Sequence, residues 1–225
     1  MAIVYQMNLF NWKDVNDLGD LERLQLVVEH LPDQELIKTL QQSRRNGRNK
    51  NPIVAMWNSL LAGVVFQHSS VESLRRELSR NAQLRELCGF DPLKGASAIP
   101  SKSAYNRFIA SIIKNKNLID EMFNELVKEL SSLLPDFGRE LAFDSKAIAS
   151  YGQRHSKREG DHRGEHDADW GKKTYRGIRE DGTGWEKVKS WFGFKLHLIV
   201  DANYELPVAM EVTKASQPDV VEMKE

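Results

Sequence analysis

The sequence contains very little cysteine and no long apolar run. A single cysteine, Cys88, excludes a disulfide framework. Cys88 follows Leu84 and Leu87 on a short predicted helix, which favours a buried structural thiol over a nucleophile. No apolar run reaches membrane-spanning length, and the first residues lack a basic-then-apolar signal. These absences predict a soluble, cytoplasmic protein without a membrane partner.

The chain also lacks internal repeats, low-complexity tracts and net charge, since 32 Lys and Arg balance 32 Asp and Glu. The balance is uneven along the chain. Residues 38–107 hold 12 Lys and Arg against 4 Asp and Glu, and acidic helical residues at 120–136 offset the excess. Such a local excess is typical of surfaces that contact nucleic-acid phosphates, although solvated helix faces give the same pattern.

The positive residues of this region cluster in "SRRNGRNKNP" and "SLRRELSRNAQLREL", which favours double-stranded DNA as the partner. The candidate DNA-binding residues in the two clusters are Arg44, Arg45, Arg48, Lys50, Arg75, Arg76 and Arg80.

Helical patterns fill the first part of the chain. Residues 53–66 form an almost wholly apolar run that is too short to span a membrane and predicts the core of a helical bundle. Ser69 and Glu72 have the spacing of a capping box. Asn81 is expected to cap a short helix that ends at Gly89.

The helical part is expected to end at a turn sequence. "DPLKGASAIPSKS", residues 91–103, predicts a loop, and two amphipathic helices follow it. Pro135–Gly138 then predicts a domain boundary. The sequence therefore predicts a mixed α and β protein, with an all-α domain for DNA binding and dimerisation over residues 1–138 and a strand-bearing domain over 139–225.

Period-two alternation marks the strands of the second domain. Residues 194–201 and 208–213 alternate around the turn sequence 201–204, which predicts an antiparallel hairpin with one apolar face. Leu141–Phe143 predicts a third short strand that ends at Asp144. Downstream, Ser216 and Asp219 have capping-box spacing and predict the start of a further helix.

A charged, glycine-rich segment at about 150–189 is expected to be a long surface loop inserted in this domain. Its histidines match no structural zinc spacing. Trp170 has polar neighbours on both sides and could stack on an unpaired base. Lys195 and His197 share a strand face and could approach DNA or a metal site, although a cross-strand packing role is equally compatible with the pattern.

Two regions together resemble a DDE transposase of a bacterial insertion sequence. The first runs from "NPIVAMWNSLLAGVVF" to "IPSKSAYNRF" and resembles the helical N-terminal domain. The second, "LAFDSKAI", "DADWGKKTYRG" and "WFGFKLHLIVDANYELPVAMEVTKASQPD", resembles the start of the catalytic domain. The resemblance implies an incomplete ribonuclease-H-like domain that begins with three antiparallel strands.

The resemblance also implies a site. Asp144 corresponds to the first catalytic aspartate and metal ligand, because a carboxylate on a rigid strand suits hard cations in a two-metal centre. The second aspartate and the glutamate of such a centre are expected beyond this chain, so Mg²⁺ or Mn²⁺ is expected only in the complete catalytic domain. The complete protein is expected to form a homodimer and to bind the element's terminal repeats.

Three alternatives remain open from the sequence. Asp144 could instead cap a helix over residues 145–152. The chain could be a non-catalytic, truncated transposase that binds DNA or dimerises and inhibits an intact copy. It could also be a complete metal nuclease that uses Asp144 with Asp201.

Overall fold

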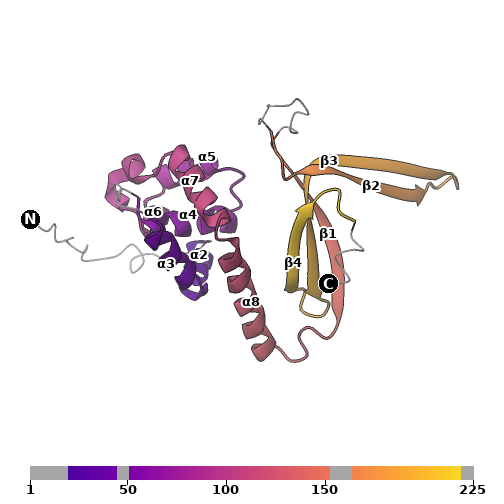
Figure 1. Ribbon diagram of the computed structural model, residues 1–225, viewed down its shortest axis with the longest axis horizontal. Helices are drawn as coiled ribbons and strands as arrows, with labels where there is room; N and C mark the ends of the chain where they lie inside the picture. The colour runs from indigo at the N-terminus through magenta and orange to yellow at the C-terminus, as the bar shows by residue number, and fades with distance from the viewer. Residues whose placement is uncertain (1–19, 45–50, 153–163, 219–225) are drawn as a thin grey trace, which may run out of the picture. The chain divides into compact units, whose positions relative to one another are not determined.

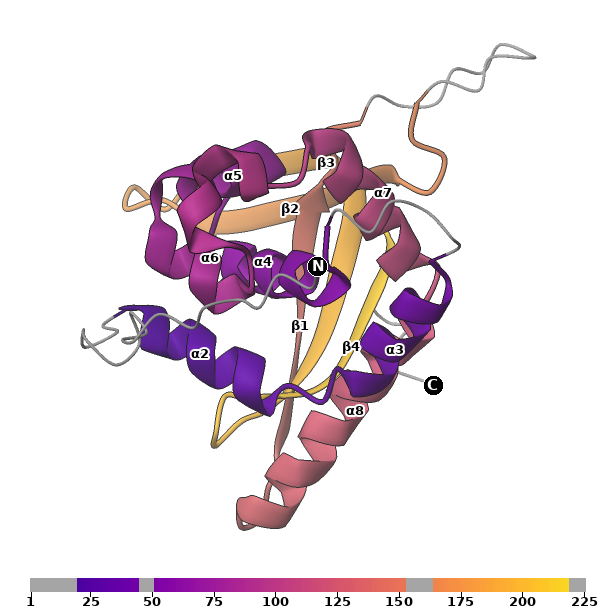
Figure 2. The same ribbon diagram turned by 90° about the vertical axis from the view of Figure 1, so that its left-hand side faces the viewer.

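The structure is a computed structural model that describes residues 20–44, 51–152 and 164–218 (Figures 1 and 2). The chain divides into two compact units, Met1–Leu126 and Val127–Glu225. The first is helical, and the second contains a four-stranded antiparallel sheet. The predicted mixed α and β class, with helices first and an antiparallel sheet after them, is confirmed. The predicted capping box at Ser216 and Asp219 lies partly outside the described residues.

The helical unit is built around one apolar helix, as the residue pattern predicts. The helices are α2 (Asp20–His30), α3 (Gln34–Gln42), α4 (Ile53–Val65), α5 (Val71–Arg80), α6 (Ala82–Cys88), the 3-10 segment η1 (Pro92–Ala98), α7 (Lys102–Ile113) and α8 (Lys116–Leu133), which continues into the second unit. Helix α4 packs against α2, α3, α5 and α6. Within the described ranges, no helix is long and apolar enough to cross a membrane.

Helix α4 contributes to two hydrophobic clusters. Ala55 and Ala62 face the first cluster, with side chains from α2, α5 and α6 that include the buried thiol of Cys88. Met56 and Trp57 face the second cluster, with side chains from α3, α7 and α8. A helix that is apolar on nearly every side can bury two faces, which explains why it occupies the centre of the unit.

Two hydrogen bonds between side chains connect polar groups in and beside this core. The Ser59 and Tyr105 hydroxyls lie 2.7 Å apart, and burial raises the pKa of Tyr105 to about 12. The Trp57 indole donates to the Asp33 carboxylate at 2.6 Å. These bonds join α4 to α7 and to the start of α3, so the three segments are held in one arrangement.

Capping residues set the helix ends, with one change from the prediction. Ser70, rather than Ser69, caps α5 by accepting a bond from the Ser73 amide at 3.2 Å. Asn81 caps α6 and Gly89 ends it in a left-handed conformation, as predicted. The loop predicted at 91–103 is in part the 3-10 segment η1.

Arg85 is a buried cation with a structural role. Arg85 is only 5% exposed. Its guanidinium donates hydrogen bonds to the carbonyls of Leu78, Ser79 and Pro92 at 2.7 to 3.0 Å. The first two carbonyls lie at the end of α5, where helix carbonyls lack partners within the helix. Arg85 therefore joins the end of α5 to the start of η1.

The sheet has one long strand that pairs with all the others. The strands are β1 (Leu141–Ala149), β2 (Asp169–Ile178), β3 (Gly184–Asp201) and β4 (Pro207–Lys214). The first part of β3 pairs with β2, and the second part pairs with both β1 and β4. Figure 1 shows β2 and β3 extending as a two-stranded ribbon. The β3–β4 hairpin with its turn at 201–204 agrees with the predicted one.

Two predictions about the strands were wrong. The segment predicted as a long loop at about 150–189 contains β2 and the first part of β3, so the sheet has four strands rather than three. The predicted short strand Leu141–Phe143 continues to Ala149. In both cases the strands are largely exposed and lack a continuous apolar face, so the residue pattern did not reveal them.

Small residues allow the β2–β3 ribbon to pack closely. Gly171 and Gly177 stand directly opposite Trp191 and Trp185, and a Cβ on either glycine would lie about 2.5 Å from the indole. At Gly193, where β3 changes partners, φ is +154°, and a Cβ there would lie 2.6 Å from the Ser150 nitrogen. Glycine is thus required where β1 and β3 approach each other most closely.

Register assigns the residues of β1, β3 and β4 to two faces, because paired residues of antiparallel strands share a face and neighbours alternate. The face that contains Asp144, here called the Asp144 face, also carries Lys146, Ile148, Leu196, Leu198, Met210 and Val212. The opposite face, here called the His197 face, carries Phe143, Ser145, Ala147, Lys195, Ile199 and Asp201.

Asp201 organises the turn between β3 and β4. Its buried carboxylate accepts bonds from the amides of Asn203, Tyr204 and Gly138 at 2.7 to 2.9 Å. The pKa of Asp201 is lowered from 3.8, chiefly by the Tyr204 bond and against the opposing effect of burial. Asp201 is therefore a turn-forming residue, as the sequence predicts.

The first prediction concerns Arg85. We expect Arg85→Met to lower the free energy of unfolding of the helical unit by about 3 kcal/mol, because one buried and two partly buried carbonyls lose a charged donor. Arg76, an exposed arginine on α5, gives the matched control. The variant Arg76→Met should change the free energy of unfolding by less than about 0.5 kcal/mol. Thermal denaturation followed by circular dichroism at the helical band measures both, and equal effects would contradict the assigned role.

The second prediction concerns Asp201 and pH. The pKa of Asp201 is lower in the folded state than in the unfolded state. The ionised carboxylate therefore stabilises the fold above about pH 4, and this stabilisation is lost as the pH falls through the folded-state pKa. The difference in unfolding free energy between the wild type and Asp201→Asn should therefore shrink at acidic pH. Urea denaturation followed by tryptophan fluorescence measures this difference. A difference that stays constant with pH would show that the carboxylate charge is unimportant.

Candidate nucleic-acid interface

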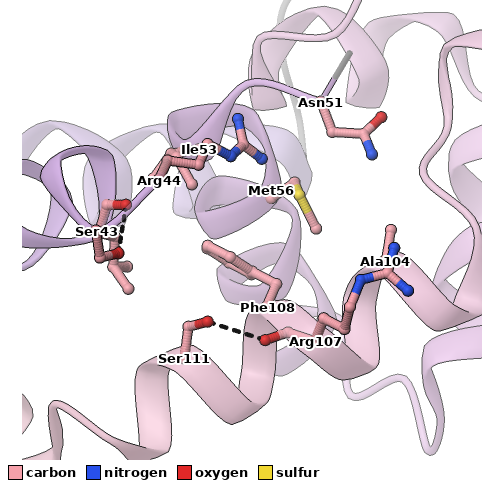
Figure 3. Close-up of a pocket in the computed structure, with 10 residues that line it drawn as sticks. Ser43, Arg44, Asn51, Ile53, Met56, Ala104, Arg107, Phe108 and Ser111 are labelled. Carbon is pink, nitrogen blue, oxygen red and sulfur yellow. Dashed lines mark hydrogen bonds between the residues drawn. The ribbon is translucent and has the colours of Figure 1, made fainter. Parts of the chain in front are cut away.

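A pocket of about 260 Å³ opens on the surface of the helical unit where α3, α4 and α7 meet (Figure 3). Arg44 follows α3 and Asn51 precedes α4, while α4 contributes Met56 and α7 contributes Arg107 and Phe108. The remaining lining residues are Leu40, Ser43, Ile53, Ala104 and Ser111. The elements that form the pocket are the same ones that the second hydrophobic cluster holds together.

The pocket combines positive charge with an apolar floor. Figure 3 shows the side chains of Arg44, Asn51 and Arg107 around the pocket, with Met56 and Phe108 between them. Arg44 is half-buried and Arg107 is exposed. No Asp or Glu lines the pocket. Two guanidinium groups and an amide without a neighbouring carboxylate suit an anionic ligand such as a phosphate.

Arg75, Arg76 and Arg80, the other predicted cations that the structure describes in the helical unit, do not line this pocket. Arg75 pairs with Glu72 at 2.6 Å and also donates to the Pro100 carbonyl at 2.8 Å, so it connects α5 to the start of α7. Arg80 pairs with Glu77, and Arg76 is exposed. The remaining three predicted cations, Arg45, Arg48 and Lys50, lie outside the described residues.

Asp144 lies in the middle of β1 rather than at the end of a strand. It is exposed, stands opposite Leu198 and accepts a bond from the Ser145 amide at 2.8 Å. Residues 145–149 continue the strand, so the alternative in which Asp144 caps a helix is wrong. A rigid strand nevertheless holds the carboxylate in a fixed position, as a metal ligand requires.

The structure does not bring Asp144 and Asp201 together. Asp144 lies on one face of the sheet, whereas Asp201 lies on the other face with its carboxylate committed to three backbone amides. The alternative of a nuclease centred on this pair therefore has no geometric support.

Lys195 and His197 lie on the face opposite to Asp144. His197 is 3% exposed, stacks on Phe143 with ring centroids 6.0 Å apart, and its Nε2 lies 2.9 Å from the Thr213 hydroxyl. This is the cross-strand packing role that the sequence left open. The Lys195 amine donates to the Gln217 carbonyl at 2.6 Å.

Trp170 lies at the start of β2 and is 50% exposed. Its ring packs against Phe192 at 5.7 Å between centroids. Trp170 thus packs against a neighbour within the sheet, and its exposed part remains accessible to a ligand.

Metal ligands are sparse in the described ranges. Among residues 20–44, 51–152 and 164–218, no three His, Cys, Asp or Glu side chains are grouped to hold a metal ion. The Asp144 carboxylate fits the oxygen preference of Mg²⁺ or Mn²⁺ but supplies only one ligand.

Sequence reasoning missed Arg107 as a site residue. It belongs to the run "IPSKSAYNRF" that carries part of the resemblance, but a single arginine on an amphipathic helix resembles any solvated cation. The tertiary structure places it beside the same pocket as Arg44, although 63 positions separate the two residues.

Comparison with known families gives one match. Residues 10–111 match the family model described as "Transposase domain (DUF772)". Searches of the curated proteins and of the solved structures found no match. The matched range covers most of the helical unit and every residue that lines its pocket. The match supports a transposase family for this chain.

Proposed function

We propose that this chain acts in DNA transposition as a DDE-type transposase of a bacterial insertion sequence, with the helical unit binding double-stranded DNA. The observation that supports the proposal most strongly is the position of the Arg44–Arg107 pocket. The whole pocket lies within the residues that match the transposase domain.

Phosphate is the ligand that the pocket suits best. Guanidinium groups bind phosphate oxygens through pairs of hydrogen bonds, and Asn51 can donate a further bond from its amide. Met56 and Phe108 form the apolar floor, and no carboxylate lines the pocket to pair with either arginine. Because phosphates carry no sequence information, this pocket would position the DNA rather than select its sequence.

The sheet unit would provide the start of a ribonuclease-H-like catalytic domain. Asp144 would be one ligand for Mg²⁺ or Mn²⁺, and such ions activate the attacking oxygen and stabilise the leaving oxygen in phosphodiester chemistry. The role of Asp144 would be to hold a carboxylate at a fixed point of the sheet. Its position in the middle of β1 supports this role.

The third prediction concerns DNA binding by the pocket. We expect the double variant Arg44→Gln, Arg107→Gln to bind duplex DNA roughly tenfold more weakly, because two phosphate contacts are lost. The slope of log affinity against log salt should fall in magnitude by about 1.8, at about 0.9 for each lost contact. Fluorescence anisotropy with a labelled duplex, measured over a salt series, gives both quantities.

A charge-matched control uses cations that already have partners. Lys38 pairs with Glu35 on α3 and Lys116 pairs with Asp120 on α8, and neither lines the pocket. The double variant Lys38→Gln, Lys116→Gln should retain the wild-type salt slope. If both double variants reduce the salt slope equally, DNA binding depends on the overall charge of the protein and the pocket has no special role.

The fourth prediction concerns catalysis. We expect the 225-residue chain to bind DNA without cleaving it in Mg²⁺ or Mn²⁺, because no second described carboxylate joins Asp144 to hold two metal ions. Gel analysis of a labelled duplex tests this. Metal-dependent cleavage that Asp144→Asn abolishes, and that Asp181→Asn in the β2–β3 turn leaves intact, would contradict the expectation.

A further inference from the structure

A second basic surface lies in the sheet unit, in a groove of about 340 Å³. Of its lining residues, the sequence had suggested only Lys195 as a possible DNA contact. Strands β1, β2 and β3 contribute to it. The lining residues are Ser145, Lys146, Ala147, Lys172, Lys173, Tyr175, Lys189, Trp191 and Lys195. Five of these nine residues are lysines, and none is Asp or Glu.

The register of β2 and β3 brings two of the lysines together. Lys173 stands directly opposite Lys189 in the antiparallel pair. Two like charges in this position repel each other and destabilise the strand pair in the free protein. An anion bound between the two amines would remove that repulsion.

Four of the groove lysines have no carboxylate partner among the described residues. Within the described part of the chain, no ion pair joins Lys146, Lys172, Lys173 or Lys189 to a carboxylate. By contrast, Arg176 of the same ribbon pairs with Glu186 at 2.9 Å on its other face. The ribbon thus carries an ion pair on one face, together with Lys172, and the facing, unpaired Lys173 and Lys189 on the other.

Aromatic rings form the apolar part of the groove. Trp191 lies over Gly171, and its indole donates to the Phe194 carbonyl at 3.0 Å, which fixes the ring. Tyr175 is 40% exposed, with the Lys173 amine 5.9 Å from its ring centroid. Lysines around fixed aromatic rings are typical of surfaces that follow a nucleic-acid backbone.

We infer that this groove, here called the lysine groove, is a second DNA-binding site that contacts backbone phosphates through Lys173 and Lys189. The inference rests on the proposed function, since it takes DNA as the polyanion. Charge complementarity supports this choice, because the lining holds five cations and no acid. An acidic protein could supply the same charges and is tested as the competing partner below.

The lysine groove is separate from the Asp144 site. Ser145, Ala147 and Lys195 line the groove and belong to the His197 face, whereas Asp144 belongs to the opposite face; of the β1 residues in the lining, only Lys146 shares the face of Asp144. The groove would therefore hold DNA without placing its phosphates against the Asp144 carboxylate. Loss of DNA affinity in groove variants can be measured without any cleavage assay.

The test uses the full chain and the variant Lys173→Gln, Lys189→Gln. Removing the facing lysines should weaken binding to labelled DNA roughly tenfold and reduce the salt slope by about 1 to 2, as expected for two lost phosphate contacts. The thermal midpoint of the free protein should not fall, because a repulsive pair is removed. The charge-matched control is Arg176→Gln, Arg179→Gln, which changes the same ribbon outside the groove and should retain wild-type affinity.

Combining variants separates the two proposals. If both sites bind DNA, the losses from the groove variant and from Arg44→Gln, Arg107→Gln should multiply, since the sites share no residue. If the groove variant binds DNA with unchanged affinity while Arg44→Gln, Arg107→Gln binds more weakly, the lysine groove is not a DNA-binding site. The proposed function would not be affected by that result. If the wild type binds no DNA, both proposals fail.

Chemical modification gives a second measurement on the unaltered protein. An amine-reactive ester followed by mass spectrometry should show that DNA protects Lys173 and Lys189 but not Lys38, which lies in the helical unit outside both binding sites. Protection by polyglutamate at the same ionic strength, without protection by DNA, would assign the groove to an acidic protein and overturn the inference.

Discussion

The sheet unit depends on the length and shape of a single strand. Strand β3 pairs with β2 along its first part and with β1 and β4 along its second part. Gly193 lies at the change of partners, and its missing side chain lets the β1 backbone pass. If β3 were shorter or could not accommodate this approach, β2 would lose its connection to the rest of the sheet. The position of Asp144 and the shape of the lysine groove both follow from this strand.

The helical unit depends in a comparable way on α4. Because this helix is apolar on nearly all sides, it carries a hydrophobic cluster on each of two faces. One cluster includes side chains of α3 and α7, whose surfaces provide Arg44 and Arg107. The pocket is therefore a consequence of core packing, although its ligand would contact only surface groups. Buried polar bonds such as that between Ser59 and Tyr105 hold these helices in one register.

Charge in this protein is organised locally, and its zero net value conceals that organisation. Many basic residues, such as Arg75, Arg80 and Arg176, are paired with acidic neighbours. The Arg44–Arg107 pocket and the lysine groove are different from these paired sites, because no acidic residue lines either one. Cations without acidic neighbours can replace the counterions of a bound polyanion, so within the described part of the chain these two surfaces support the proposed DNA contacts. Two separated contacts would let one chain hold DNA by both of its units.

The sequence by itself determined the elements that have strong local patterns. The apolar run at residues 53–66, the cap at Asn81, the end at Gly89 and the β3–β4 hairpin all follow from residue spacing, because caps and alternation act over a few positions. The turn role of Asp201 was also predictable for this reason.

Only the tertiary structure decided which distant residues meet. Strand β2 is polar on both faces, so no periodic apolar signal distinguished it from a loop, and its pairing with β3 created the lysine groove. The same holds for Arg44 and Arg107, which come together because two helices pack on a shared core. Register likewise placed Asp144 and His197 on opposite faces of the sheet, since a difference of one residue in a strand reverses the direction of a side chain.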